Sequence, residues 1–446
     1  MTKEQTNRST NFNTILILSA AVWLVVMNTT MFNIALPTIL EDFSLAPSEG
    51  AWIVSGYSIV LAIFTITYTR LSDYLPLRML LIIGMIIFGS SSLLGFFADS
   101  FTWLLIARLC QASGAAAIPG LSFVFASRYI PVSYRGRAMA IIASASALGF
   151  GLGPVAGGII TQFLSWNYLF IITLFVVAVI PILKKKMPEE TVEKGAFDIL
   201  GGLLTGGTIT SFLLFITTYH WYYPVIGLLL AVLLWMRITR AQLPFIQPEL
   251  LQNKLYRRLL YITYIGFATN FAILFLMPLM LQQIYNLGPL LIGMVIFPGA
   301  ILSAGAAIIV GKLIDKFGNI IVLVSAQGLL LLSSMILYFL FAVNFYMIMF
   351  AYLFTSFGFS SLSSSSTNEV SRILPDEQIG AGIGLKQLTH FIGSASGAVL
   401  AGILLEVTQA TGAASFLLPL LVLIIGMSYS YTIAYVYIKK KPKERP

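Results

Sequence analysis

Fourteen long apolar segments constrain this chain more than any other feature. Each approaches or exceeds the roughly 20 mostly apolar residues that a helix needs to cross a bilayer. Of the 446 residues 58% are hydrophobic and only 10% are charged, whereas a soluble chain carries about a quarter charged residues. The segments are expected at 14–36, 51–69, 79–98, 101–127, 137–163, 167–183, 197–217, 222–238, 258–284, 290–311, 319–341, 344–370, 379–405 and 413–437. They predict an all-α polytopic membrane protein with 14 transmembrane helices.

The positive charge indicates orientation in a membrane. Lysines and arginines outnumber acids by 26 to 17, yet, with the N-terminus in the cytoplasm, all except Arg108 are expected at cytoplasmic loops, tails or helix ends. Lys386 is placed with them. Cytoplasmic enrichment of basic residues is the positive-inside rule. The sequence therefore predicts a multi-pass protein of the bacterial cytoplasmic membrane with both termini cytoplasmic, and the lipid bilayer, not nucleic acid, as its partner.

An internal repeat divides the chain. The stretches RLSDYLPLR (70–78) and GKLIDKFGN (311–319) each place an acid among basic residues in a short connection. With two central helices set aside, both follow the second helix of a six-helix half. We expect an N-terminal bundle at 1–183, a linker with two inserted helices at 184–240, a cytoplasmic linker at 241–257, and a C-terminal bundle with a basic tail at 258–446. Paired halves are typical of secondary transporters.

Several motifs match one family. They are NTTMFNIALP (28–37), RLSDYLPLR, ARLCQASGAA (107–116), GFGLGPVAGG (149–158) and GKLIDKFG. With them the chain resembles the major facilitator superfamily, in particular its fourteen-helix drug:proton antiporters, which include Gram-positive tetracycline pumps and staphylococcal multidrug pumps. The resemblance implies the major facilitator fold in a 6+2+6 arrangement. It also implies export of small-molecule drugs in exchange for protons by a monomer.

Two departures from the tetracycline pumps bear on the substrate. Those pumps carry glutamates at the positions of Phe150 and Ser394, and the first-helix motif commonly carries an acid where this chain has Asn28. We therefore expect lipophilic or zwitterionic aromatic drugs, such as fluoroquinolones and dyes, instead of a tetracycline–metal complex. The substrate-binding candidates combine amides and rings, which suit promiscuous recognition. They are Asn28, Asn33, Tyr57, Gln111, Phe150, Asn270 and Gln387, with His390 as a further candidate.

Proton coupling needs a group whose protonation changes between states. Arg108 lies inside the fourth segment, where a cation must face the bundle interior; a structural arginine bonded to backbone carbonyls is the alternative. The other candidates are His390, Glu369 and Asp198, and histidine titrates near neutral pH. Helix packing for His390, an interfacial position for Glu369 and a helix cap for Asp198 are the corresponding alternatives.

A conformational gate is expected from two further groups of residues. Asp73 with Arg70 and Arg78, and Asp315 in the second repeat, would form cytoplasmic latches. The fifth segment contains Gly149, Gly153, Pro154 and Gly157, which permit close helix approach and bending.

Other classes of function are less well supported by the residues. GAAIIVGKL (305–313) has the wrong glycine spacing for a phosphate loop, so no nucleotide is expected, and no cofactor or metal either. Two histidines and scattered acids argue against a membrane-embedded enzyme. A channel lacks a filter-like repeat. A secondary transporter of a metabolite or peptide remains the alternative.

Overall fold

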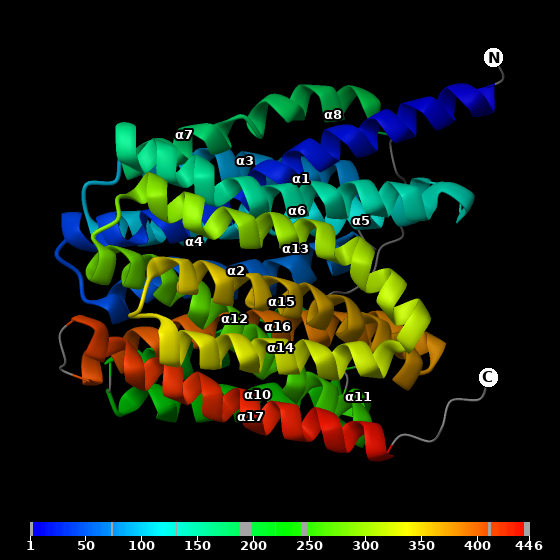
Figure 1. The fold of residues 1–446 in the computed structure, drawn as a ribbon. Helices are drawn as coiled ribbons and strands as arrows, with labels where there is room; N and C mark the ends of the chain where they lie inside the picture. Colours follow the sequence, from blue (N-terminus) through cyan, green and yellow to red (C-terminus); the bar gives the residue numbers. More distant parts are fainter. Residues whose placement is uncertain are drawn as a thin grey trace. The chain divides into compact units, whose positions relative to one another are not determined.

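The computed structural model describes residues 3–72, 75–130, 132–187, 198–218, 220–241, 248–408 and 412–440, and every regular element in them is helical (Figure 1). In the first part of the chain the helices are α1 (Lys3–Asp42), α2 (Pro47–Leu71), α3 (Leu77–Phe96), α4 (Phe101–Ala115), α5 (Ala117–Tyr129), α6 (Val132–Phe163), η1 (Trp166–Tyr168), α7 (Leu169–Leu174), η2 (Val177–Val179) and α8 (Ile180–Lys186). The rest are α9 (Ile199–Thr218), α10 (Tyr222–Arg240), α11 (Pro248–Gln252), α12 (Lys254–Tyr285), α13 (Pro289–Phe317), α14 (Asn319–Leu340), α15 (Phe345–Ile373), α16 (Asp376–Val407), η3 (Gly412–Phe416) and α17 (Leu417–Lys440).

The predicted apolar segments coincide with these helices, with three differences. The segment expected at 413–437 begins in η3 and continues in α17. The segment expected at 101–127 is divided at Ala116 into α4 and α5, and the segment expected at 167–183 is divided into four short helices. Pro119 and Pro181 lie just after these breaks, and proline lacks the backbone N–H that a continuous helix uses. Among the described residues, eleven helices are long and apolar enough to cross a membrane. The fourteen-span count stays a prediction.

A side-chain cap and two residues with positive φ mark three helix boundaries. The Asn253 side chain accepts hydrogen bonds from the backbone N–H groups of Leu255 and Tyr256 at 3.0 and 3.2 Å, which starts α12. The same helix ends at Asn286, which adopts a left-handed conformation with φ of 52°, as is common after a helix C-terminus. Gly318, with φ of 85°, separates α13 from α14.

The described chain forms two compact units. The first contains Met1–Leu45, Trp52–Gly202 and Gly288–Phe297, and the second contains Ala46–Ala51, Leu203–Leu287 and Pro298–Pro446. The division inside α13 falls at Pro298, a proline within the helix. The expected boundaries at 183, 240 and 257 stay predictions.

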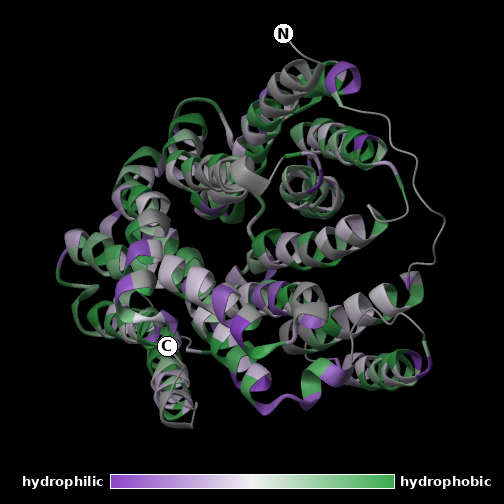
Figure 2. Cartoon of the chain, turned by 90° about the vertical axis from the view of Figure 1, so that its right-hand side faces the viewer, coloured by the Kyte–Doolittle hydropathy of each residue, from purple (hydrophilic) through white to green (hydrophobic). Residues whose placement is uncertain are grey.

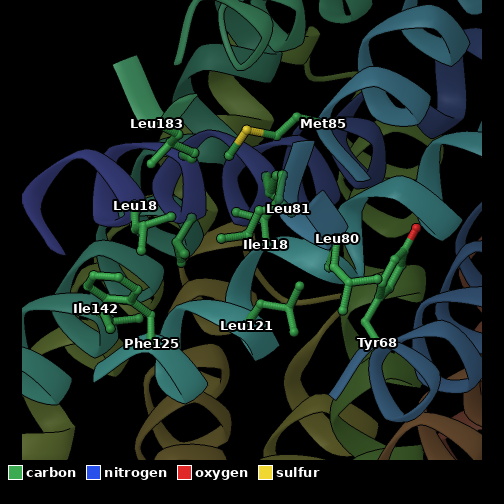
Figure 3. Packing of buried hydrophobic residues seen from close by; sticks show 14 of the residues in the cluster. Leu18, Tyr68, Leu80, Leu81, Met85, Ile118, Leu121, Phe125, Ile142 and Leu183 are labelled. Carbon is green, nitrogen blue, oxygen red and sulfur yellow. The ribbon is translucent and has the colours of Figure 1, made fainter. Parts of the chain in front are cut away.

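The core of the first unit is built mainly from α1, α3, α5 and α6. Figure 3 shows Leu80, Leu81 and Met85 of α3 near Ile118 and Leu121 of α5, all buried. In the second unit α12 packs along α16, and α14 packs along α15 and α17.

The helix bodies are apolar, as a bilayer requires. Figure 2 shows strongly hydrophilic residues mainly near helix ends and in connections, while hydrophobic residues cover much of the helices. Large apolar side chains also remain exposed. Examples on α10 are Leu228, Leu229 and Trp235, which are 60%, 61% and 59% exposed. An apolar surface of this kind is typical of helices that contact lipid.

Candidate functional site

Arg108 is the centre of a buried polar group in the first unit. Its side chain on α4 is 1% exposed. Nη1 donates hydrogen bonds to Asn28 Oδ1 of α1 at 2.8 Å and to Gln111 Oε1, one turn along α4, at 2.7 Å. Both acceptors are neutral amide oxygens, and no carboxylate among the described side chains bonds Arg108.

Aromatic rings complete the surroundings of this guanidinium. The Arg108 Cζ atom lies 4.0 Å from the centroid of the Phe32 ring and 4.1 Å from that of the Tyr57 ring. A guanidinium over a ring face is attracted by the ring quadrupole, most strongly where water is excluded. Gln111 Nε2 also donates to Ser92 Oγ at 2.8 Å, which links α4 to α3. The cation is therefore stabilised in place by amides and rings.

The substrate-binding candidates of the first unit divide into two groups. Asn28, Tyr57 and Gln111 all contact Arg108. Asn33 is 5% exposed, and within the described residues its Oδ1 has no hydrogen-bond partner. Phe150 is partly buried on α6. The alternative for Arg108, bonding to backbone carbonyls, differs from the observed partners, which are side chains.

The glycine run of α6 forms a close seam with α1, which we call the α1–α6 seam. A Cβ atom added to Gly149 would lie 2.8 Å from the Trp23 carbonyl oxygen, and one added to Gly157 would lie 2.8 Å from that of Met31. At Gly153 the added Cβ would overlap Thr30 Oγ1. Small residues are needed here because the two backbones approach closely. Pro154 lies inside α6 without ending it.

His390 lies among aromatic rings in the second unit. Its ring centroid is 3.7 Å from that of Phe267 on α12, 6.3 Å from that of Phe271 and 6.4 Å from that of Phe359 on α15. Gln387, one turn earlier on α16, lies with Nε2 3.1 Å from His390 Nδ1. Two predicted residues therefore meet here. Asn270 is 3% exposed on α12.

Lys386 is a site residue whose burial the sequence analysis did not predict. It was assigned to a cytoplasmic helix end, but its side chain is 1% exposed. Nζ donates to Thr367 Oγ1 of α15 at 2.9 Å and lies 5.5 Å from the centroid of the Phe267 ring. The signal was present, because position 386 lies well inside the segment predicted at 379–405 and one turn before His390.

Glu369 is fully buried near the end of α15. Its carboxylate accepts hydrogen bonds from Asn319 Nδ2 of α14 at 2.6 Å and from the Tyr437 hydroxyl of α17 at 2.9 Å. Asn319 also donates to the Ser365 carbonyl at 3.1 Å. The carboxylate thus ties three helices of the second unit together.

The remaining candidates differ in what the structure says of them. Asp198 Oδ1 accepts from the Gly201 backbone N–H at 3.0 Å at the start of α9, which is the geometry of a helix cap. Arg78 is partly buried in the first turn of α3. Asp73 and the side chains of Arg70 and Asp315 lie outside the described residues, so both expected latches stay predictions.

The sequence and fold match known transporters. The sequence matches the Major Facilitator Superfamily over residues 18–343 and again over residues 321–446. The chain belongs to this family. It is a multi-pass membrane protein and a transporter of small molecules, not an enzyme.

Relatives in the superfamily transport different compounds. The chain is 27% identical over 380 residues to the riboflavin transporter RibZ of Clostridioides difficile, covering 82% of each chain. It is 26% identical over 400 residues to the multidrug efflux pump LfrA of Mycolicibacterium smegmatis, covering 86% of this chain and 79% of LfrA.

Solved structures share the fold at low identity. A POT family transporter in complex with 5-aminolevulinic acid has a TM-score of 0.74 at 11% identity, with 97% of this chain and 96% of that chain covered. An inward-facing, occupied bacterial homologue of the human lysosomal transporter Spinster has a TM-score of 0.70 at 13% identity, with 97% and 98% covered. These similarities support the major facilitator fold only.

Proposed function

We propose that this transporter exports lipophilic or zwitterionic aromatic drugs, including fluoroquinolones and dyes, in exchange for protons. It works by alternating access in the bacterial cytoplasmic membrane, with fourteen spans and both termini cytoplasmic. The observation that carries the proposal is the α1–α6 seam, whose glycines lie in the stretch that resembles the antiporter motif. The similarity to the multidrug efflux pump LfrA also supports export. The layout of the sequence motifs resembles the SdrM type of staphylococcal multidrug pump.

The α1–α6 seam suits a conformational role because it is thin. At the glycines 149, 153 and 157 no side chain of α6 separates its backbone from α1, so this stretch can slide or bend with few side chains in the way. Pro154 removes one backbone hydrogen bond inside the same stretch. We assign Gly149, Gly153, Pro154 and Gly157 to the gate. Asp73, Arg70, Arg78 and Asp315 complete the proposed gate.

Buried polar groups supply the proposed coupling and binding functions. Arg108, His390, Glu369 and Asp198 are the residues proposed for proton coupling. Drug contacts are proposed for Asn28, Asn33, Tyr57, Gln111, Phe150, Asn270 and Gln387. The transporter needs no cofactor or nucleotide in this scheme and acts as a monomer.

A metabolite transporter is the second candidate function. The relative RibZ is a riboflavin transporter, and the partly buried rings of Phe359 and His390 are candidates for stacking on a flat ring system. The two candidates differ in direction and in substrate range.

Everted membrane vesicles test the proposal. A proton gradient, acid inside, is imposed without ATP, and accumulation of a fluoroquinolone or a fluorescent dye is followed. We expect accumulation that a protonophore abolishes and that vesicles without the protein lack. Absence of gradient-dependent accumulation of any such compound would rule out drug:proton antiport, and riboflavin transport without drug transport would favour the second candidate.

A further inference from the structure

We propose that Lys386 and the rings beside it form a subsite for the negatively charged group of an aromatic substrate, a carboxylate. This inference deepens the proposed function and rests on it for the transport of aromatic compounds. The binding step itself can be measured separately.

The ammonium of Lys386 is buried with few partners. An ammonium group has three N–H donors, and in the described part of the chain Lys386 Nζ has one hydrogen-bond acceptor, Thr367 Oγ1 at 2.9 Å. A buried charge is normally paired because loss of hydration is costly. A hydroxyl oxygen provides only part of that compensation, so the site is suited to an additional negative group.

The buried carboxylate nearest in sequence to Thr367 does not fill this need. Glu369 lies two residues further along α15, and its oxygens accept from Asn319 and Tyr437. No described carboxylate forms an ion pair with Lys386. Glu369 therefore belongs to a separate cluster, and the positive charge of Lys386 stays available to a ligand.

The walls beside the ammonium suit a planar ring. The Phe267 ring lies 5.5 Å from Lys386 Nζ and 3.7 Å from the His390 ring, measured to ring centroids. Phe359 lies 5.0 Å from Phe267 in an edge-on arrangement. Phe267 is fully buried, while the Gln387, His390 and Phe359 side chains beside it are partly buried. A ligand with an aromatic body and a carboxylate matches both features.

A single ammonium favours a single negative charge. Lysine acts as a compact point charge without the two-pronged geometry that arginine offers to phosphate and carboxylate. We therefore assign an aromatic monocarboxylate to the subsite, in place of a phosphate ester or a dication. Zwitterionic drugs with a ring-bound carboxylate meet this requirement, whereas purely cationic dyes do not use it.

Equilibrium dialysis of the purified full-length protein tests the subsite. The probes are labelled 2-naphthoate and 2-naphthamide, which have the same ring system and differ in charge. We expect the wild-type protein to bind the carboxylate at least about tenfold more tightly, a difference typical of a hydrogen bond to a charged group. Lys386→Met should abolish the preference, Lys386→Arg should keep part of it, and Lys254→Met, at an exposed lysine, should leave it unchanged.

The outcomes separate the inference from the proposed function. No preference in the wild-type protein, or an equal preference in folded Lys386→Met, overturns the subsite. If Lys386→Met does not fold, Lys386→Gln, which can still donate to Thr367, replaces it with the same expectation. If vesicles accumulate drug but the purified protein shows no carboxylate preference, the proposed function stands and the subsite is rejected. If the protein prefers the carboxylate but vesicles accumulate no drug, only the proposed function is rejected.

Discussion

The two compact units each bury a cation in aromatic surroundings, but they satisfy it in different ways. In the first unit two amide oxygens accept from Arg108, and the centroids of two rings lie 4.0 and 4.1 Å from its Cζ atom. In the second unit Lys386 has one hydroxyl acceptor and a ring at 5.5 Å. The first cation has more partners from the protein, although its Nε has no hydrogen-bond partner among the described residues, while the second has a single described acceptor.

The difference follows from side-chain chemistry. A planar guanidinium can hydrogen-bond along its edge while both faces contact rings, so it suits a fixed polar junction. An ammonium on a flexible stem directs three donors outward and needs acceptors around it. We infer that Arg108 holds α1, α2 and α4 in register in addition to its proposed role in proton coupling, and that Lys386 selects substrate charge. The predictions below test this contrast, from the largest expected effect to the smallest.

Removal of the Arg108 charge should have the largest effect. Arg108→Met leaves the Asn28 and Gln111 oxygens without their donor, which costs about 1–3 kcal/mol for each unsatisfied buried group. We expect accumulation in vesicles to fall to background and the free energy of unfolding in detergent to drop. Arg108→Lys, which keeps charge but loses the planar fork, should give an intermediate result. If Arg108→Met unfolds with the same free energy as the wild type, Arg108 does not hold the helices together, and the contrast drawn with Lys386 is wrong.

A bulky side chain in the α1–α6 seam should impair transport more than expression. Gly153→Leu places atoms against Thr30 and the Met27 carbonyl oxygen, which lies 2.8 Å from an added Cβ. Overpacking of this kind typically costs about 1–3 kcal/mol. We expect most gradient-driven accumulation to be lost while membrane yield stays close to normal.

Gly305→Leu provides the matched control for the seam, because no described atom beyond its own stretch of helix lies within 4 Å of a Cβ added to Gly305 on α13. This variant should transport like the wild type. Equal loss of transport in both variants would show that the effect is not specific to the α1–α6 seam.

Neutralising Glu369 should impair proton coupling while drug can still cross the transporter down its own gradient. Glu369→Gln keeps one oxygen to accept from Asn319 or Tyr437 but cannot carry an exchangeable charge. We expect gradient-driven accumulation to fall severalfold while downhill efflux of preloaded drug continues. His390→Ala is tested in parallel. Intact gradient-driven transport in both variants would remove these two residues from the coupling scheme.

Removal of the hydroxyl beside Lys386 should have the smallest effect. Thr367→Val deletes the one acceptor that the described residues give the ammonium, and a net hydrogen bond contributes about 1 kcal/mol. Because a ligand carboxylate competes with this hydroxyl, we expect naphthoate binding to stay within about fivefold of the wild type, and to change toward tighter binding. Loss of the carboxylate preference, as expected for Lys386→Met, would show that Thr367 is essential to the subsite.

Much of the fold was predictable because bilayer crossing depends on local composition. Helices occur at all fourteen apolar segments, and Gln111, one turn from Arg108 along the same helix, is one of its acceptors, whereas the contact with Asn28 was not predicted. The breaks at Ala116 and near Phe175 were not predicted, because they depend on how prolines and packing act together within an apolar run.

The composition of the second site was harder to predict for physical reasons. Lys386 looked like one more basic residue, since its burial depends on Thr367 and Phe267, which are distant in sequence. The partners of Glu369 lie on α14 and α17, which sequence spacing cannot place beside α15. Phe32 also escaped notice, because a ring that faces a guanidinium cannot be distinguished in sequence from one that faces lipid.

Proton movement caused by substrate tests the central claim of drug:proton exchange most directly. Everted vesicles are energised to hold a proton gradient, a fluoroquinolone is added, and the internal pH is followed with a fluorescent indicator. We predict that substrate dissipates the gradient in wild-type vesicles, by a much smaller amount in Gly153→Leu vesicles and not in vesicles without the protein. Drug accumulation with no substrate-induced proton release in the wild type would contradict the exchange.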